Sequence, residues 1–182
     1  MKDKKNLKIS IIIPTWNRKK KLLRLLNIII AKFQKQKIIY EIIICDSFST
    51  DGTQIAVSKN YGKNKNIRYE NIKNNNISSK RNTGIKKSKF DNVLLLDDDC
   101  VPINNFFNII KKYLLSSRGK NIFCGQYFTQ KKLISTSNYY YFRDVKNLKV
   151  NSCEEINYKN IITGCCFFNK KNINKKLYFN EK

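Results

Sequence analysis

The sequence predicts an α/β protein with three layers (α/β/α), in which helices cover both faces of a mostly parallel sheet. Two observations lead to this prediction. Short runs of β-branched and other apolar residues, at 8–13, 38–45 and 93–96, have the length and composition of buried strands. Segments with a helical spacing of apolar residues separate these runs, and strands that alternate with helices pair in parallel. A chain of 182 residues suits a single domain with its own core.

The first strand is the run at 8–13, which Pro14 ends. Residues 15–17 form a polar turn that can cap a helix. The packed face of that helix carries six apolar residues, Leu22, Leu23, Leu25, Leu26, Ile29 and Ile30. The sequence therefore predicts a strand, a short loop and an amphipathic helix in this order.

The second strand, at 38–45, leads into a segment rich in turn-forming residues. Gly52 marks a turn in this segment, and either Ser49 or Asp51 can cap the helix that follows. We expect this second helix to be short and to end near residue 61.

A weaker strand at 67–69 and a helix at 79–88 continue the alternation. The run at 93–96 is the clearest buried strand in the chain, because all four of its residues are apolar. Asn104 or Asn105 can cap the helix after it.

The pattern becomes less regular after Gly119. We expect strands at 122–128 and 161–168, and at most a short helix at 170–175. Residues 129–152 between these strands are irregular and rich in aromatic side chains.

The charge is unusual, because 37 Lys and Arg residues stand against 13 Asp and Glu residues and give a net charge of +24. Polyanions are therefore natural partners, although codons rich in A and T explain an excess of lysine equally well. The chain has six cysteines without a C-x-x-C pair and no histidine, which argues against a zinc site and favours a reducing, cytoplasmic compartment. No apolar run approaches the roughly 20 residues of a membrane span.

Three polar clusters directly follow predicted strands, at 14–18, 46–47 and 97–99. In an open parallel sheet the carboxyl ends of the strands meet at one edge, where ligands bind. We therefore expect these clusters to form one site, although they are far apart in the sequence.

Three successive aspartates repel one another, so a cation should offset Asp97, Asp98 and Asp99. A hard divalent ion prefers oxygen ligands and leaves positions for substrate phosphates. The alternative is a solvated acidic loop, and for Asp46 the alternative is a turn or cap aspartate.

Basic and aromatic residues give further candidates. Lys80 and Arg81 can face a diphosphate, or they can lie on an exposed basic helix face. Trp16 and the aromatic residues at 139–142 can stack on a sugar or a base, or they can belong to the core.

Together these segments resemble the family 2 glycosyltransferases, whose fold is the three-layer GT-A type. The matching segments are SIIIPTWNR at 10–18, DSFSTDGT at 46–53, KRNTGI at 80–85, LDDDCVP at 96–102 and TG at 163–164. They occur in the family's order and cover nearly the whole chain. One departure is Phe48, where many members have glycine.

The resemblance implies a nucleotide-sugar donor, with uracil at Asp46 and a Mg²⁺ or Mn²⁺ ion at Asp99. Asp97 would face the ribose or the metal, and residues 163–164 would line the acceptor side. The implied donor-binding residues are Pro14, Thr15, Asn17, Arg18, Asp46, Ser47, Arg81, Asp97 and Asp98.

The catalytic base is not identified by the resemblance. The family's base usually follows about ten residues after the segment that resembles FNE at 179–181, which places it beyond Lys182. Within the chain the candidates are Asp144, Glu154, Glu155 and Glu181, and none of them matches the base motif. We therefore interpret residues 1–182 as a single GT-A domain, with a donor-binding half at 1–118 and the start of an acceptor-side half at 119–182.

The expected function is metal-dependent transfer of a sugar, with inversion, from a donor that is UDP-linked by this interpretation. The acceptor would be a glycan or a lipid-linked molecule, and the basic surface would suit peripheral contact with an anionic membrane on its cytoplasmic side. The alternatives are a catalytically silent donor-binding fragment and a basic nucleic-acid-binding protein. We do not expect nucleic acid as a partner, because the lysines are scattered and form no basic arm.

Overall fold

The computed structural model describes residues 7–102, 105–116, 123–124, 143–144, 164–172 and 179. Its elements are β1 (Lys8–Thr15), α1 (Lys19–Gln36), β2 (Ile39–Asp46), α2 (Thr53–Tyr61), β3 (Ile67–Asn71), α3 (Ile77–Lys87), β4 (Asn92–Leu96), α4 (Phe106–Ser116), β5 (Phe123–Cys124), β6 (Arg143–Asp144), β7 (Cys165–Asn169) and a short 3₁₀ helix (Lys170–Asn172).

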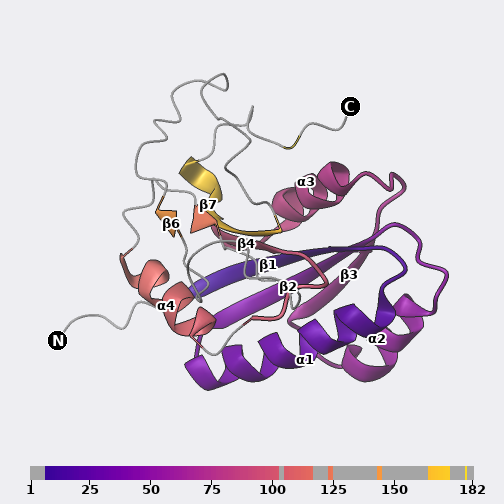
Figure 1. Ribbon diagram of the computed structural model, residues 1–182, viewed down its shortest axis with the longest axis horizontal. Coiled ribbons are helices and arrows are strands. Elements are labelled where there is room, and N and C mark those ends of the chain that lie inside the picture. Colours follow the sequence, from indigo (N-terminus) through magenta and orange to yellow (C-terminus); the bar gives the residue numbers. More distant parts are fainter. Residues whose placement is uncertain are drawn as a thin grey trace, which may run out of the picture.

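The strands form one sheet in the order β3-β2-β1-β4-β7-β5-β6 (Figure 1). The pairs β1–β2, β1–β4 and β2–β3 are parallel. The pairs β4–β7, β5–β7 and β5–β6 are antiparallel, so β7 inserts between two strands that precede it in sequence. The prediction of an α/β fold with a mostly parallel central sheet is confirmed.

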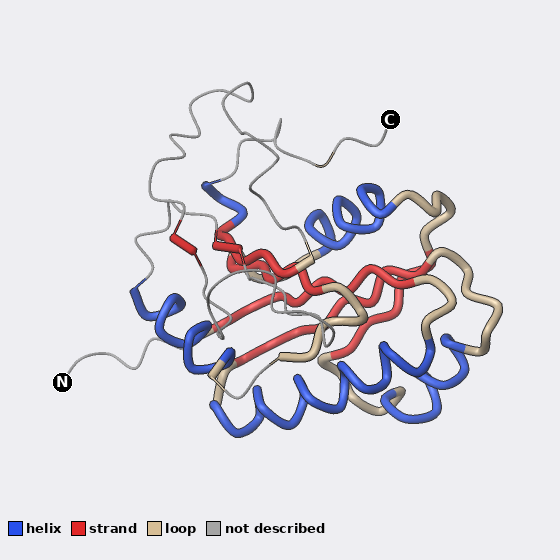
Figure 2. The backbone as a smooth tube through the Cα atoms, in the orientation of Figure 1, coloured by secondary structure: helices blue, strands red, loops and turns tan. Residues whose placement is uncertain are grey.

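Helices cover both faces of this sheet (Figures 1 and 2). In β1, Ile9, Ile11 and Ile13 pack with α1, α2 and α4 on one face. Ile12 faces the other side, where it packs with Ile85 of α3. Because both faces are buried, the strand is apolar at nearly every position, and this explains why the runs could be recognised in the sequence.

The loop that begins α1 differs from the prediction. The residue before the helix is Arg18, and its side chain makes no capping hydrogen bond. The polar turn at 15–17 therefore does not cap α1. One free N–H of the first turn is satisfied from another loop, since Lys19 N donates to Asp51 Oδ2 at 2.9 Å.

The next two helix starts differ from the prediction by only one or two residues. Gly52, in the left-handed region at φ 78°, directly precedes α2, while Asp51 just before it accepts a hydrogen bond from Thr53 N at 3.1 Å. The helix α3 begins at Ile77 rather than at residue 79, because the Asn76 side chain accepts a hydrogen bond from Ser78 N at 2.7 Å.

The later helix and strands lie close to their predicted places. Asn105 directly precedes α4, and its carbonyl accepts from Ile109 N at 3.1 Å, as a cap residue does. The strands β5 and β7 fall within the predicted runs at 122–128 and 161–168, although β7 extends one residue further. Within the predicted short helix at 170–175, the structure describes a 3₁₀ helix at Lys170–Asn172.

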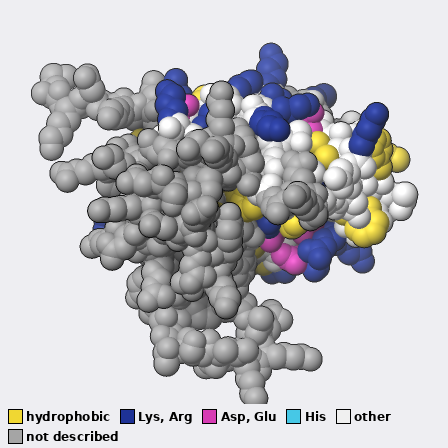
Figure 3. Space-filling model, turned by 90° about the horizontal axis from the view of Figure 1, so that it is seen from above, with side chains coloured by type: hydrophobic (Ala, Val, Ile, Leu, Met, Phe, Trp, Pro, Cys, Tyr) yellow, Lys and Arg dark blue, Asp and Glu magenta, His cyan; other side chains and the backbone are white. Residues whose placement is uncertain are grey.

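No helix among the described residues is long and apolar enough to cross a membrane. On the face seen in Figure 3, the Lys and Arg side chains lie in several separate groups over the described surface. This distribution agrees with the scattered lysines of the sequence.

Candidate functional site

A cleft of about 390 Å³ lies at the carboxyl ends of β1 and β4. It is lined by Pro14, Thr15, Trp16, Arg18, Asn75, Ile77, Lys80, Asp97, Asp98 and Asp99. The fold therefore brings the cluster at 14–18 and the cluster at 97–99 together, as the topology of a parallel sheet requires. Asn75 and Ile77 were not singled out in the sequence, because a polar loop before a helix carries no signal of its own.

Asp98 joins the ends of β1 and β4. Its carboxylate accepts hydrogen bonds from Thr15 Oγ1 at 2.7 Å and from Arg18 Nη1 at 3.1 Å, and its side chain is only 3% exposed. Burial raises the pKa of Asp98, while the hydrogen bonds from Thr15 and Arg18 oppose this shift. Both oxygens of Asp98 are thus occupied by the protein itself.

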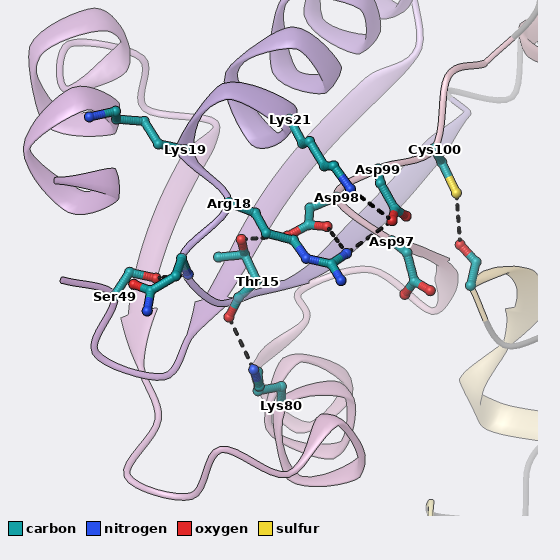
Figure 4. A network of polar contacts seen from close by, with 12 residues as sticks. Thr15, Arg18, Lys19, Lys21, Ser49, Lys80, Asp97, Asp98, Asp99 and Cys100 are labelled. Atoms are coloured by element: carbon teal, nitrogen blue, oxygen red, sulfur yellow. Dashed lines mark hydrogen bonds and ion pairs between the residues drawn. The ribbon is translucent and has the colours of Figure 1, made fainter. Parts of the chain in front are cut away.

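Asp99 is the open member of the three aspartates. Its side chain is 43% exposed and pairs with Arg18 at 2.9 Å and with Lys21 at 3.6 Å. Figure 4 shows the Arg18 guanidinium lying between Asp98 and Asp99. The hydrogen bond and the charge of Asp98 raise the pKa of Arg18, which therefore remains positively charged.

Asp97 points away from this pair, toward α3. Arg81 Nη2 donates to Asp97 Oδ1 at 2.8 Å, and the Arg81 guanidinium lies 5.4 Å from the centre of the Phe179 ring. The backbone of Asp97 is held by Gly164, whose carbonyl accepts from Asp97 N at 2.7 Å. Asp97 therefore ties β4 to α3 and to the turn before β7.

Asp46 is buried at the end of β2 and organises the loop after it. Its oxygens accept hydrogen bonds from Ser49 N at 2.7 Å, from the Ser49 hydroxyl, and from the Tyr69 hydroxyl at 2.8 Å. Burial, reinforced by the Asp46 carboxylate, raises the pKa of Tyr69, so this phenol remains a donor. Only 1% of Asp46 is exposed and these bonds tie it to its own loop and to β3, so its predicted role in holding uracil stays a prediction.

Asn17 connects the loop after β1 to the loop after β2 by hydrogen bonds. Its backbone N–H donates to Ser49 Oγ at 2.7 Å, and its side-chain oxygen accepts from Thr50 N at 2.7 Å. Asn17 adopts a left-handed backbone at φ 52°, which asparagine tolerates better than most residues. Ser47 is held in a similar way, because its hydroxyl donates to the Asn74 carbonyl at 3.1 Å. Both residues were predicted to bind the donor, and both hold loops in this structure.

The described residues contain no group of three Asp, Glu, Cys or His side chains arranged to hold a metal ion. A Mg²⁺ ion, however, is commonly bound by one or two carboxylates together with waters and substrate phosphates. The exposed Asp99 suits that role, and Asp97, with its partly exposed carboxylate, is the second candidate.

Some candidates lie outside the described residues, namely Glu181, Thr163 and the aromatic residues at 139–142. Asp144 belongs to β6 at the edge of the sheet opposite β3. The catalytic base therefore stays a prediction.

An open sheet with parallel central strands and a polar cleft at their carboxyl ends defines the class of α/β proteins that bind ligands at this edge. Residues 10–177 match the sequence family described as "Glycosyl transferase family 2". The chain belongs to this family, as the sequence motifs indicate.

Two curated relatives are, by name, an N-acetylglucosaminyltransferase and a chondroitin synthase. Poly(ribitol-phosphate) beta-N-acetylglucosaminyltransferase TarP of Staphylococcus aureus (strain N315) is 33% identical over 131 residues, which cover 63% of this chain and 39% of TarP. Chondroitin synthase of Pasteurella multocida (strain Pm70) is 35% identical over 102 residues, which cover 54% of this chain and 10% of that protein. The chain thus spans less than half the length of these relatives.

Solved structures share the fold. The crystal structure of residues 1–349 of S. aureus TarS covers 72% of this chain with a TM-score of 0.59 at 24% identity, and the alignment covers 39% of that chain. The same TarS segment in complex with UDP superposes with a TM-score of 0.57 at 25% identity, again over 72% of this chain and 39% of that one. A mannosyltransferase from Pyrobaculum calidifontis, in complex with GDP-Man and Mn²⁺, superposes over 63% of this chain and 34% of its own with a TM-score of 0.51 at 22% identity.

Proposed function

We propose that this chain binds the donor of a glycosyltransferase that moves a sugar from a UDP-linked nucleotide sugar to an acceptor hydroxyl with inversion. The observation that carries the proposal is the cleft at the ends of β1 and β4, where Asp98 and Asp99 pair with Arg18 and where Asp97 and Lys80 also belong to the lining. Such a site can hold an anionic diphosphate beside a metal-binding carboxylate. TarS, which shares the fold, has been crystallised with UDP and with UDP-GlcNAc.

Arg18 and Lys21 are suited to the diphosphate. Both are about half exposed in this structure and both pair with the exposed Asp99, so Lys21 can turn toward a ligand, while Arg18 can meet it with N–H groups that its bond to the buried Asp98 does not use. Arg binds phosphate oxygens through paired hydrogen bonds, and Lys acts as a mobile positive charge. The proposed role of both residues is to hold the diphosphate as its negative charge grows.

Asp99, with Asp97, would hold Mg²⁺ or Mn²⁺. Bound there, the ion supplies positive charge beside the departing nucleoside diphosphate. Asp98 stays buried and accepts hydrogen bonds from Thr15 and Arg18, which hold the loop after β4 against the end of β1.

Inversion follows from a single displacement, in which an acceptor hydroxyl loses its proton to a carboxylate base and attacks the anomeric carbon. The proposed base is a carboxylate, and Glu181 and Asp144 are the candidates within the chain. The proposed domain organisation is a donor-binding half at 1–118, followed by the start of an acceptor-side half.

The proposed acceptor is a glycan or a lipid-linked molecule. The relative TarP acts, by its name, on a poly(ribitol-phosphate). A net charge of +24 would favour a similarly anionic acceptor, and it would also favour peripheral contact with an anionic membrane.

The test of this function is calorimetric titration of UDP with and without Mn²⁺, on the wild type and on Asp99→Asn. Asp91→Asn is the matched control, because Asp91 precedes β4 at the opposite end of the strand and pairs with the exposed Lys171 at 2.8 Å. We expect Mn²⁺-dependent binding of UDP that Asp99→Asn abolishes and Asp91→Asn retains. A folded wild type that binds no UDP contradicts the proposal, and tight, salt-sensitive binding of nucleic acid would then favour the rival prediction.

A further inference from the structure

Lys80 lies at the floor of the cleft, in the first turns of α3. Only 5% of the residue is exposed, and among the described residues no other lysine is as deeply buried. Its ammonium donates to the Thr15 carbonyl at 3.1 Å and to Asn75 Oδ1 at 3.1 Å, and Figure 4 shows it reaching toward Thr15. An ammonium has three N–H donors, so within the described part of the chain these two bonds leave one unused.

Lys80 differs from the other buried cations of the described chain. Arg81, also buried, pairs with Asp97 at 2.8 Å. Lys80, in contrast, has no described carboxylate within the 4.0 Å of an ion pair. The charges of Asp46 and Asp98 reach it only from a greater distance.

This arrangement is costly for the folded protein. Burial lowers the pKa of Lys80, and the charges of Asp46 and Asp98 offset that effect only in part. A buried charge with an unused donor, facing a cleft, is a feature of binding sites rather than of cores.

The position of Lys80 in the cleft indicates which part of a nucleotide it meets. Arg18 and Asp99 lie at the exposed side, where strongly hydrated phosphates are readily bound. Trp16 and Ile77 line the same cleft near Lys80, because Trp16 follows Thr15, whose carbonyl accepts from Lys80, and Ile77 precedes Lys80 by one turn of α3. Apolar walls beside a single fixed donor suit a flat heterocyclic ring that carries a hydrogen-bond acceptor.

We propose that the Lys80 ammonium donates a hydrogen bond to a ring carbonyl oxygen of the donor's nucleobase, so that Lys80 selects bases that carry such a carbonyl. The sequence alone suggested a diphosphate contact for Lys80, and its depth beside Trp16 and Ile77 favours the base instead. This inference rests on the proposed donor site. In this proposal, Lys80 is the residue that sets which nucleobases the donor site accepts.

The test compares Lys80→Met with Lys59→Met, which removes the same charge from an exposed position on α2. The probes are UDP, ADP, whose adenine has no ring carbonyl, and inorganic pyrophosphate, each with Mn²⁺. We expect Lys80→Met to weaken UDP binding roughly 10- to 100-fold, as the loss of a hydrogen bond to a charged donor does. Binding of ADP and pyrophosphate should stay unchanged, and Lys59→Met should behave as the wild type.

Two results would overturn the inference. Unchanged UDP affinity in a folded Lys80→Met protein would show that the ammonium does not contact the nucleotide. An equal loss for pyrophosphate and UDP would place Lys80 on the phosphates.

A second measurement needs no variant. On the wild type, at least one of 2-thio-UDP and 4-thio-UDP should bind more weakly than UDP, because sulfur is the poorer acceptor. Equal binding of all three would also overturn the inference. If instead the wild type binds no UDP at all, then the proposed function fails, and this outcome is distinct from UDP binding that is insensitive to Lys80.

Discussion

Gly84 of α3 lies so close to Ile12 of β1 that a Cβ atom at the glycine would be 2.3 Å from Ile12 Cγ2. Ile12 is fully buried, and the sulfur of Cys45 is only 3.2 Å from the same position. We therefore expect Gly84→Ala to lower the free energy of unfolding by about 1–3 kcal/mol through overpacking, although alanine is the better helix former. Urea denaturation of the variant and the wild type measures this difference.

Ser58→Ala is the control for this variant, because Ser58 lies at an exposed position of another helix, α2. Its effect should stay within about 0.5 kcal/mol. If Gly84→Ala unfolds at the same urea concentration as the wild type, then α3 can move away from β1, and the close approach is not required.

Phe48 has a left-handed backbone at φ 53° and is 55% exposed. A side chain with a Cβ is strained in this region, which accounts for the glycine that resembling sequences carry at this position. We expect Phe48→Gly to be more stable than Phe48→Ala by about 1 kcal/mol, because only glycine relieves the strain. Thermal unfolding of the two variants measures this, and an alanine variant of equal or greater stability would contradict it.

Much of the fold could be predicted from the sequence because its strands are buried on both faces. The runs at 8–13, 38–45 and 93–96 each lie in or within about one residue of an observed strand. The convergence of residues 14–18 and 97–99 followed from parallel topology alone.

The remaining features depend on contacts between distant segments. Asn17 and Thr50 are 33 residues apart, and their hydrogen bond decides that Asn17 braces a loop instead of capping α1. The burial of Lys80 depends on where α3 docks over the sheet, whereas in the sequence Lys80-Arg81 could equally be an exposed basic pair. How deeply such a side chain is buried depends on tertiary packing, and tertiary packing of this kind leaves no periodic pattern in the sequence.

Cys45 of β2 is buried, and burial raises the pKa of its thiol to about 12. The thiolate is the reactive form, so Cys45 in the folded protein should resist iodoacetamide at pH 7 and at pH 9 alike. In urea the thiol regains an ordinary pKa, and alkylation should become rapid and faster at the higher pH. Mass spectrometry of the Cys45 peptide measures this, and equal labelling rates in the folded and the unfolded protein would contradict it.

Asp97 and Asp99 are both predicted metal ligands, but they should differ in their effect on stability. Arg81, the partner of Asp97, has a side chain only 6% exposed, so Asp97→Asn leaves a buried guanidinium without its counter-charge. We expect that variant to lose about 1–3 kcal/mol of unfolding free energy. Asp99 pairs only with half-exposed cations, and such pairs contribute at most about 1 kcal/mol. Urea denaturation without metal should therefore find Asp99→Asn close to the wild type and Asp97→Asn clearly weaker. Equal losses of unfolding free energy would contradict this prediction and would mean that the ion pairs of Asp99 also stabilise the cleft. A loss of UDP binding in Asp99→Asn could then result from a destabilised cleft rather than from a missing metal ligand.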